Sequence, residues 1–147
     1  MRKTTACLIA ILTCAWVNSF GQSNGKPQWK VVKEFHLTGQ TQSAGPITLF
    51  TPSEQGFYRV TVYLAAFTNM NQASGWSAAV SWTDRTGLAG TIITSTDLGD
   101  GNSYSVVGPQ SFSPKAGAPV QLFVEPQSPP PQNSTYDIEL NIEELTH

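Results

Sequence analysis

Apolar and polar residues alternate along several stretches of this 147-residue chain. Over 58–64 every second residue is apolar, namely Tyr58, Val60, Val62 and Leu64. The same alternation recurs over 76–82, 120–124 and 136–142. A period of two is typical of a β-strand that buries one face, because successive side chains point to opposite faces. The pattern therefore predicts antiparallel strands with one face in water.

Turn-forming residues separate these stretches at the spacing expected of an all-β domain. They include Asp84-Arg85-Thr86-Gly87 and the proline-rich run 126–133. No stretch has a helical period. We therefore predict an all-β fold, an antiparallel two-sheet β-sandwich of jelly-roll type. About eight strands are expected, near 30–37, 46–51, 56–68, 76–84, 88–96, 103–113, 118–125 and 135–144.

The N-terminal segment has the pattern of a secretory signal peptide. Arg2 and Lys3 give it a positive start, and the apolar run 6–17 is too short to span a bilayer. Ser19 and Gly21 then form a small-x-small cleavage pattern. The expected organisation is a signal peptide at 1–21, a flexible leader at 22–29 and a β-sandwich domain at 30–147.

Both cysteines of the chain, Cys7 and Cys14, lie inside this segment. The mature protein is therefore expected to begin near Gln22, to be secreted into the extracellular space or the periplasm, and to fold without a disulfide. A lipoprotein acylated at Cys14 is the alternative. Thr13 is not the small residue that such processing prefers before the cysteine.

The charge of the chain limits its partners. Cleavage removes Arg2 and Lys3 from a total of 8 basic residues and none of the 10 acidic ones, so the mature protein is more acidic than the whole chain. No basic cluster occurs anywhere in the sequence. Nucleic acid and anionic membrane surfaces are therefore poor partners, and we expect no membrane span.

Histidine is scarce, which argues against several kinds of catalysis. The chain contains 2 histidines, His36 in an expected strand and His147 at the terminus. A nucleophilic triad or a histidine-based metal site needs imidazoles in suitable places. We interpret His36 as a solvated strand residue that lies opposite a face of Val31, Phe35 and Leu37. The sequence thus predicts no enzyme, no metal and no cofactor.

Paired carboxylates leave one catalytic alternative open, because their separation is a property of the fold. Each carboxylate also has a simpler explanation, as in Asp84, which opens a turn. A small secreted glycoside hydrolase is accordingly the third functional hypothesis. Its candidate acids are Asp84, Asp97, Asp100, Glu125 and Glu139.

The run Asp97-Leu98-Gly99-Asp100-Gly101-Asn102 has the composition of a calcium-binding loop. Its spacing does not match the EF-hand, which places oxygen ligands at alternate positions and ends in glutamate. Asp100-Gly101 is by itself a hairpin signal. We interpret the run as a structural turn.

Aromatic residues give two candidate binding features. Trp76 and Trp82 share a face with Ala78 and Val80 and are therefore predicted to be core residues. Trp29 precedes the first strand and is the candidate aromatic for stacking on a ligand such as a sugar. A row opposite the core face of 58–64 is the candidate face for self-association and consists of Phe57, Tyr63 and Phe67.

Short motifs resemble a known group of folds. Ile47-Thr48-Leu49-Phe50-Thr51-Pro52 followed by Gly56-Phe57-Tyr58-Arg59-Val60 resembles the start of tumour-necrosis-factor-like and complement-type jelly rolls. The chain is also similar to small uncharacterised secreted bacterial or phage-tail β-modules, through the turn Lys115-Ala116-Gly117 and the tyrosine-led strand 136–145. The resemblance implies a jelly roll, frequent trimerisation and a binding role. It implies no functional residue, because those folds bind through variable loops.

Together these patterns predict a secreted, non-catalytic binding or surface-assembly module that self-associates, as a homo-oligomer and a trimer if the jelly-roll resemblance holds. The alternative is a carbohydrate-binding module, whose partner would be a polysaccharide or a cell surface.

Overall fold

The computed structural model of the chain describes residues 26–68, 74–99, 101–128 and 130–146. The expected signal peptide, both cysteines, Asp100 and His147 lie outside the described residues.

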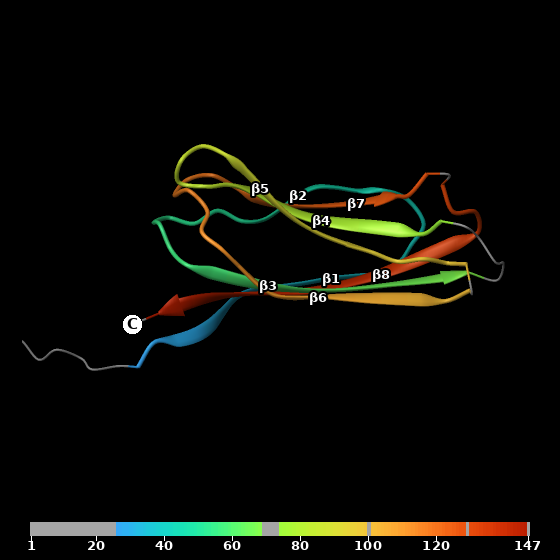
Figure 1. The fold of residues 1–147 in the computed structure, drawn as a ribbon, viewed down its shortest axis with the longest axis horizontal. Helices are drawn as coiled ribbons and strands as arrows, with labels where there is room; N and C mark the ends of the chain where they lie inside the picture. Colours follow the sequence, from blue (N-terminus) through green and yellow to red (C-terminus); the bar gives the residue numbers. More distant parts are fainter. Residues whose placement is uncertain (1–25, 69–73, 100, 129, 147) are drawn as a thin grey trace, which may run out of the picture.

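Eight strands form two four-stranded sheets that pack face to face (Figure 1). Sheet A has the order β1-β8-β3-β6, and sheet B has the order β2-β7-β4-β5. Neighbouring strands are antiparallel throughout. The strands are β1 (Gln28–Gln40), β2 (Ala44–Phe50), β3 (Tyr58–Thr68), β4 (Trp76–Thr83), β5 (Ala89–Ser95), β6 (Ser103–Phe112), β7 (Val120–Pro126) and β8 (Ser134–Thr146).

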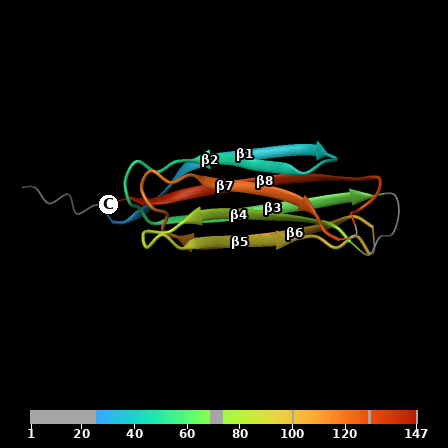
Figure 2. The ribbon, with the colours of Figure 1, turned by 90° about the horizontal axis from the view of Figure 1, so that it is seen from above.

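The pairing of the strands is that of a jelly roll. β1 pairs with β8, β2 with β7, β3 with β6 and β4 with β5, so the chain is one long hairpin wound into two sheets. The strands of both sheets run along the long axis of the molecule (Figure 2). The predicted antiparallel two-sheet sandwich of jelly-roll type is confirmed, and the described residues contain no helix.

The strand boundaries lie close to the predicted ones, with the largest differences at the two ends of the chain. β1 begins at Gln28 and β8 extends to Thr146. The last two residues of the expected leader 22–29 therefore belong to β1. Trp29 is held in the sheet because it pairs with Leu145, and its ring centroid lies 6.2 Å from that of Phe57.

The core lies between the sheets and is built from the inward-facing residues of the alternating strands. Leu64 on β3 and Leu122 on β7 are completely buried. Trp76 is also buried, and Trp82 is partly buried, with its ring centroid 4.8 Å from that of Phe112. The prediction of a core residue is confirmed for Trp76, whereas Trp82 is only partly buried and packs against the core.

One predicted face is wrong at the start of β1. Val31 is 46% exposed, whereas Phe35 and Leu37 pack against the core. The pairing with β8 shifts by one residue between Val31 and Lys33. Such a β-bulge adds a residue to one strand and thus moves the side chains beyond it to the opposite face. The alternation alone does not reveal where a bulge lies.

Gly-Pro pairs interrupt two of the four edge strands, with Gly45-Pro46 in β2 and Gly108-Pro109 in β6. A Cβ atom at Gly45 would lie 2.6 Å from the carbonyl oxygen of Leu122, and one at Gly108 would lie 2.6 Å from that of Val60. Glycine thus lets the edge strand approach its neighbour closely, and the following proline has no N–H group to offer a further strand. These two edges are poorly suited to pairing with another chain.

The turn between β4 and β5 is organised by Asp84. Its Oδ1 atom accepts hydrogen bonds from the hydroxyl and the N–H of Thr86, at 2.7 and 2.8 Å, and from the N–H of Leu88, at 2.9 Å. These bonds favour the ionised carboxylate, so the pKa of Asp84 is lowered, first through the Thr86 hydroxyl and then through the Leu88 N–H. Asp84 opens the turn as predicted.

This turn should make stability depend on pH. Because the pKa is lower in the folded than in the unfolded protein, the stabilisation is fully present above the unfolded value of about 4 and is lost as pH falls through the folded value. We expect Asp84→Asn to flatten the pH dependence of the free energy of unfolding below about pH 4. Urea unfolding of both proteins across this range measures the effect, and parallel profiles would contradict it.

Candidate binding surface

The outer face of sheet A brings together side chains from all four of its strands. The register places His36 of β1 beside Glu139 of β8, Glu139 beside Tyr63 of β3, and Tyr63 beside Val106 of β6. One row across the sheet thus passes from a histidine and a carboxylate to an aromatic ring and an aliphatic side chain. Along this row the face is polar over β1 and β8 and apolar over β3 and β6.

Two tyrosines form the centre of the apolar half. The ring centroids of Tyr63 and Tyr104 lie 6.1 Å apart, and the ring planes differ by 28°. Tyr63 is 39% exposed and Tyr104 is 71% exposed. Ala65 lies opposite Tyr104 in the register and is buried. We call Tyr63 and Tyr104 the tyrosine platform.

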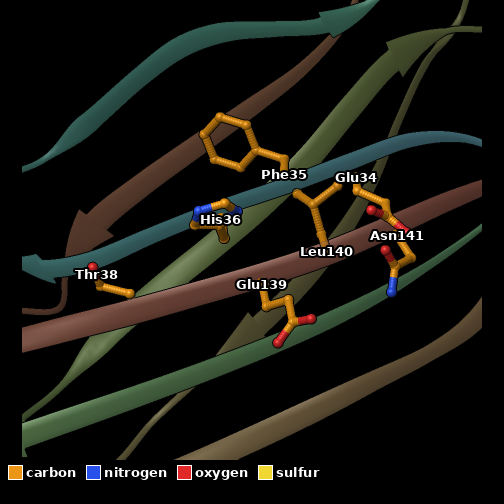
Figure 3. Close-up of a pocket in the computed structure, with 7 residues that line it drawn as sticks. All are labelled: Glu34, Phe35, His36, Thr38, Glu139, Leu140 and Asn141. Carbon is orange, nitrogen blue, oxygen red and sulfur yellow. The ribbon is translucent and has the colours of Figure 1, made fainter.

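The polar half borders a shallow depression of about 380 Å³ over β1 and β8 (Figure 3). Its polar lining side chains include Glu34, His36, Glu139 and Asn141. None of these four side chains hydrogen-bonds to another residue that the structure describes. Figure 3 shows that Glu139 and Asn141 extend to the side of the sheet opposite the ring of Phe35, which packs against the core. Four polar groups with unused hydrogen-bonding capacity therefore lie beside the tyrosine platform.

The charged groups at the other end of the same face are paired. Arg59 donates from Nε to Glu143 Oε2 at 2.6 Å and from Nη2 to Oε1 at 3.1 Å. This bidentate bond lowers the pKa of Glu143 and raises that of Arg59. The Arg59 guanidinium also lies 4.4 Å from the ring centroid of Trp29. We interpret this cluster as a clamp that fastens the start of β1 to β8 and β3.

A tyrosine strengthens the same end of the sheet from the core side. Tyr58 is buried, and its hydroxyl donates to Glu144 Oε1 at 2.9 Å. Burial, followed by the hydrogen bond to Glu144, raises the pKa of Tyr58 to about 12. The phenol therefore stays neutral and keeps donating this bond across the whole physiological range.

The aromatic residues singled out in the sequence occupy different parts of this face. Phe57, Tyr63 and Phe67 are all exposed. Phe57 lies at the clamp, beside Trp29, and Tyr63 belongs to the platform. Trp29 is only partly exposed, with the Arg59 guanidinium over its ring. Two outward-facing residues of β3, Arg59 and Thr61, lie between Phe57 and Tyr63 along the chain. The two aromatic side chains therefore belong to different parts of the face.

Sequence reasoning missed Tyr104 and Val106. The alternation over 103–106 was visible, but here the aromatic and aliphatic side chains point outward and the serines point inward. Ser105 accepts a hydrogen bond from the Thr94 hydroxyl at 2.8 Å, which satisfies this inward hydroxyl between the two sheets. A strand whose larger apolar side chains point outward cannot be recognised until its partner strand and the register between them are known.

The candidate carboxylates for glycoside cleavage do not share one strand or face. Glu139 lies on sheet A, Glu125 is the next-to-last residue of β7 in sheet B, and Asp84 is engaged in the β4–β5 turn. Asp97 accepts a hydrogen bond from the N–H of Gly99 in the connection to β6. His36 is exposed beside Glu139, as expected of a solvated strand residue.

The strands that flank the run 97–102 belong to different sheets, β5 to sheet B and β6 to sheet A, so β5 and β6 do not form a hairpin with each other. Leu98 is completely buried and its carbonyl accepts a hydrogen bond from the N–H of Gly101. Asn102 Oδ1 accepts a hydrogen bond from the N–H of Thr68. Among the described residues, no three His, Cys, Asp or Glu side chains are grouped as metal ligands.

Comparison with models of known protein families finds no match to the chain, and comparison with curated proteins finds none either. Within the part of the chain that the structure describes, no helix has the length and apolar character needed to cross a lipid bilayer.

Proposed function

We propose that this chain is a secreted, non-catalytic binding module whose outer sheet A face binds a carbohydrate. The supporting observation is the exposed tyrosine platform beside polar side chains that have no partner among the described residues. Secretion and the absence of catalysis belong to this proposal and rest on the sequence.

The tyrosine platform supplies the apolar half of such a site. A pyranose ring has an apolar face of C–H groups that packs on an aromatic ring, and the negative face of the ring attracts these groups. The two rings lie next to each other, with their centroids 6.1 Å apart, and both are exposed, so neighbouring sugars of one chain can pack on them. A tyrosine side chain has only a few rotatable bonds, so little side-chain entropy is lost when a sugar packs on the ring.

The polar half distinguishes a carbohydrate from a second protein surface. Docking of an apolar protein patch would remove Glu34, His36 and Glu139 from water without supplying partners, which is costly for ionisable groups. A sugar brings hydroxyl groups that donate and accept hydrogen bonds along the same row. Asn141 and Glu34 lie opposite each other in the neighbouring row of the same face and offer further hydrogen-bonding groups.

Removal of the platform should abolish binding without unfolding the protein. Binding to xylan, mannan, soluble β-glucan and chitin is measured by affinity electrophoresis and pull-down. We expect Tyr104→Ala to weaken binding to the recognised polysaccharide about tenfold, and Tyr63→Ala combined with Tyr104→Ala more strongly. Phe57→Ala is the matched control, because Phe57 is an exposed aromatic on the same face outside the platform. Equal binding by wild type and the double variant would refute the proposal.

Self-association through the same face is the second candidate, because Phe57, Tyr63 and Phe67 are exposed together on one face of sheet A. The solution mass of these proteins separates the two candidates. If the face joins subunits, Tyr63→Glu converts an oligomer into a monomer. If it binds carbohydrate, Tyr63→Glu leaves the mass unchanged and removes polysaccharide binding.

A further inference from the structure

The four sheet edges of the molecule differ in how they are protected. β2 and β6 contain the Gly-Pro interruptions. β1 has two register shifts and charged residues along its length. The fourth edge strand, β5, has the sequence AGTIITS, with no proline and no charged residue, and it pairs with β4 without any shift. Proline, charge and bulges are the features that usually prevent edge-to-edge pairing, and β5 lacks all three.

The hydrogen bonds at both ends of the β4–β5 ladder show which groups of β5 remain available. The N–H of Asp84 donates to the carbonyl of Leu88, and the N–H of Thr96 donates to the carbonyl of Trp76. Both bonds belong to even-numbered residues in one unshifted register. Hydrogen-bonded pairs alternate along an antiparallel ladder, so the even residues of β5 bond to β4. The backbone groups of Thr91, Ile93 and Ser95 therefore point away from the sheet.

The neighbouring sheet does not use these outward groups. β5 and β6 lie on the same side of the sandwich (Figure 2), where the Thr94 hydroxyl donates to the Ser105 hydroxyl. This contact joins side chains and leaves the outward backbone of β5 unpaired among the described residues.

The side chains around this edge suit a second copy of the same chain. Ile93 is 63% exposed and continues an apolar row through Ala79 to Phe123 on the outer face of sheet B. The outward residues of β4 on either side of Ala79 are serines, Ser77 and Ser81. Two copies of this edge can meet about a two-fold axis without bringing like charges together, because β5 carries no charge. A charged partner strand would find no opposite charge on β5.

We infer that two copies of the chain associate through β5, strand to antiparallel strand, and form one continuous eight-stranded sheet from two copies of sheet B. Full overlap of the seven-residue strands places Thr91 opposite Ile93 of the second copy and pairs the outward backbone groups of both. The interface does not involve the tyrosine platform, so it holds whatever sheet A binds.

The test is the mass of the protein in solution at about 1–100 µM, by light scattering and sedimentation. We expect a dimer whose dissociation constant rises tenfold to a hundredfold, as an order of magnitude, in Thr91→Pro and in Ile93→Lys, because two-fold symmetry introduces each change twice. Ile93→Lys keeps every backbone donor and guards against misfolding of the proline variant. Gln121→Lys on β7 is the matched control, since it adds the same charge to the outer face away from the edge.

Hydrogen exchange adds a readout at the level of single residues. In the wild-type dimer the N–H groups of Thr91 and Ile93 should exchange at least tenfold more slowly than the N–H groups at the same positions in Ile93→Lys. Residue 91 gives the cleaner comparison, because it is the same in both proteins. A monomeric wild-type protein at 100 µM, as an order of magnitude, or a dimer that survives both edge variants would overturn the inference. Dissociation by Tyr63→Glu but not by the edge variants would also overturn it, and would support self-association through sheet A.

Discussion

Replacing Trp76 with alanine is expected to lower the free energy of unfolding by about 3–5 kcal/mol. The side chain is 2% exposed, and its ring centroid lies 4.5 Å from that of Tyr136. Trp76 belongs to β4 of sheet B and Tyr136 to β8 of sheet A, so alanine would leave a cavity at a contact between the sheets. The indole Nε1 also donates to Ser134 Oγ at 3.0 Å, and this buried hydroxyl would lose a partner.

Two further variants separate the contributions to this effect. Trp76→Phe keeps most of the ring volume but cannot donate to Ser134, and should cost about 1–3 kcal/mol. Tyr104→Ala removes an exposed ring and should change stability by less than about 1 kcal/mol. Urea unfolding followed by circular dichroism measures all three. If Trp76→Ala destabilised no more than Tyr104→Ala, the contact between Trp76 and Tyr136 would not hold the sheets together.

The strands of this fold were predictable because most of them bury one face. The alternation over 58–64 and 136–142 is set by burial against the opposite sheet, and burial is the dominant favourable term in folding. The jelly-roll type was expected from the number of strands and from the resemblance. The order of strands within each sheet depends on long-range pairings such as β1 with β8, which no local pattern encodes.

The candidate binding surface was only half predictable, for a related reason. Tyr63 was recognised because it lies opposite a clear core row on its own strand. Its partner Tyr104 lies 41 residues further along the chain, and their contact depends on the pairing of β3 with β6. The register between strands shifts at the bulge beside Val31 and again at the Gly-Pro interruption at Gly108. A prediction from alternation assumes that the register continues without such shifts. Edges and bulges decide which residues meet, and they leave weak local signals.

The interruption at Gly108 leads to the second large effect, because Gly108→Ala should destabilise the protein by about 3 kcal/mol. Gly108 has a φ of 127°, a conformation that residues with a side chain rarely adopt. A Cβ atom there would also lie 2.6 Å from the carbonyl oxygen of Val60 and 2.7 Å from Cα of Thr61. Both contacts are with the backbone of β3, so no side chain can rotate to relieve them. The variant must push β6 away from the sheet.

Gly117→Ala is the matched control for the backbone conformation. Gly117 has a φ of 76°, but nothing lies within 4 Å of the position that its Cβ would occupy. Alanine there should cost about 1 kcal/mol, through the unfavourable φ alone. The difference between the variants in urea unfolding therefore measures the close approach of β6 to β3. Because β6 carries Tyr104, Gly108→Ala should also weaken polysaccharide binding under conditions where the variant is still folded, whereas Gly117→Ala should not. Equal destabilisation by the two changes would mean that β6 can move away from β3 at little cost, and that the Gly-Pro interruption does not hold the tyrosine platform in place.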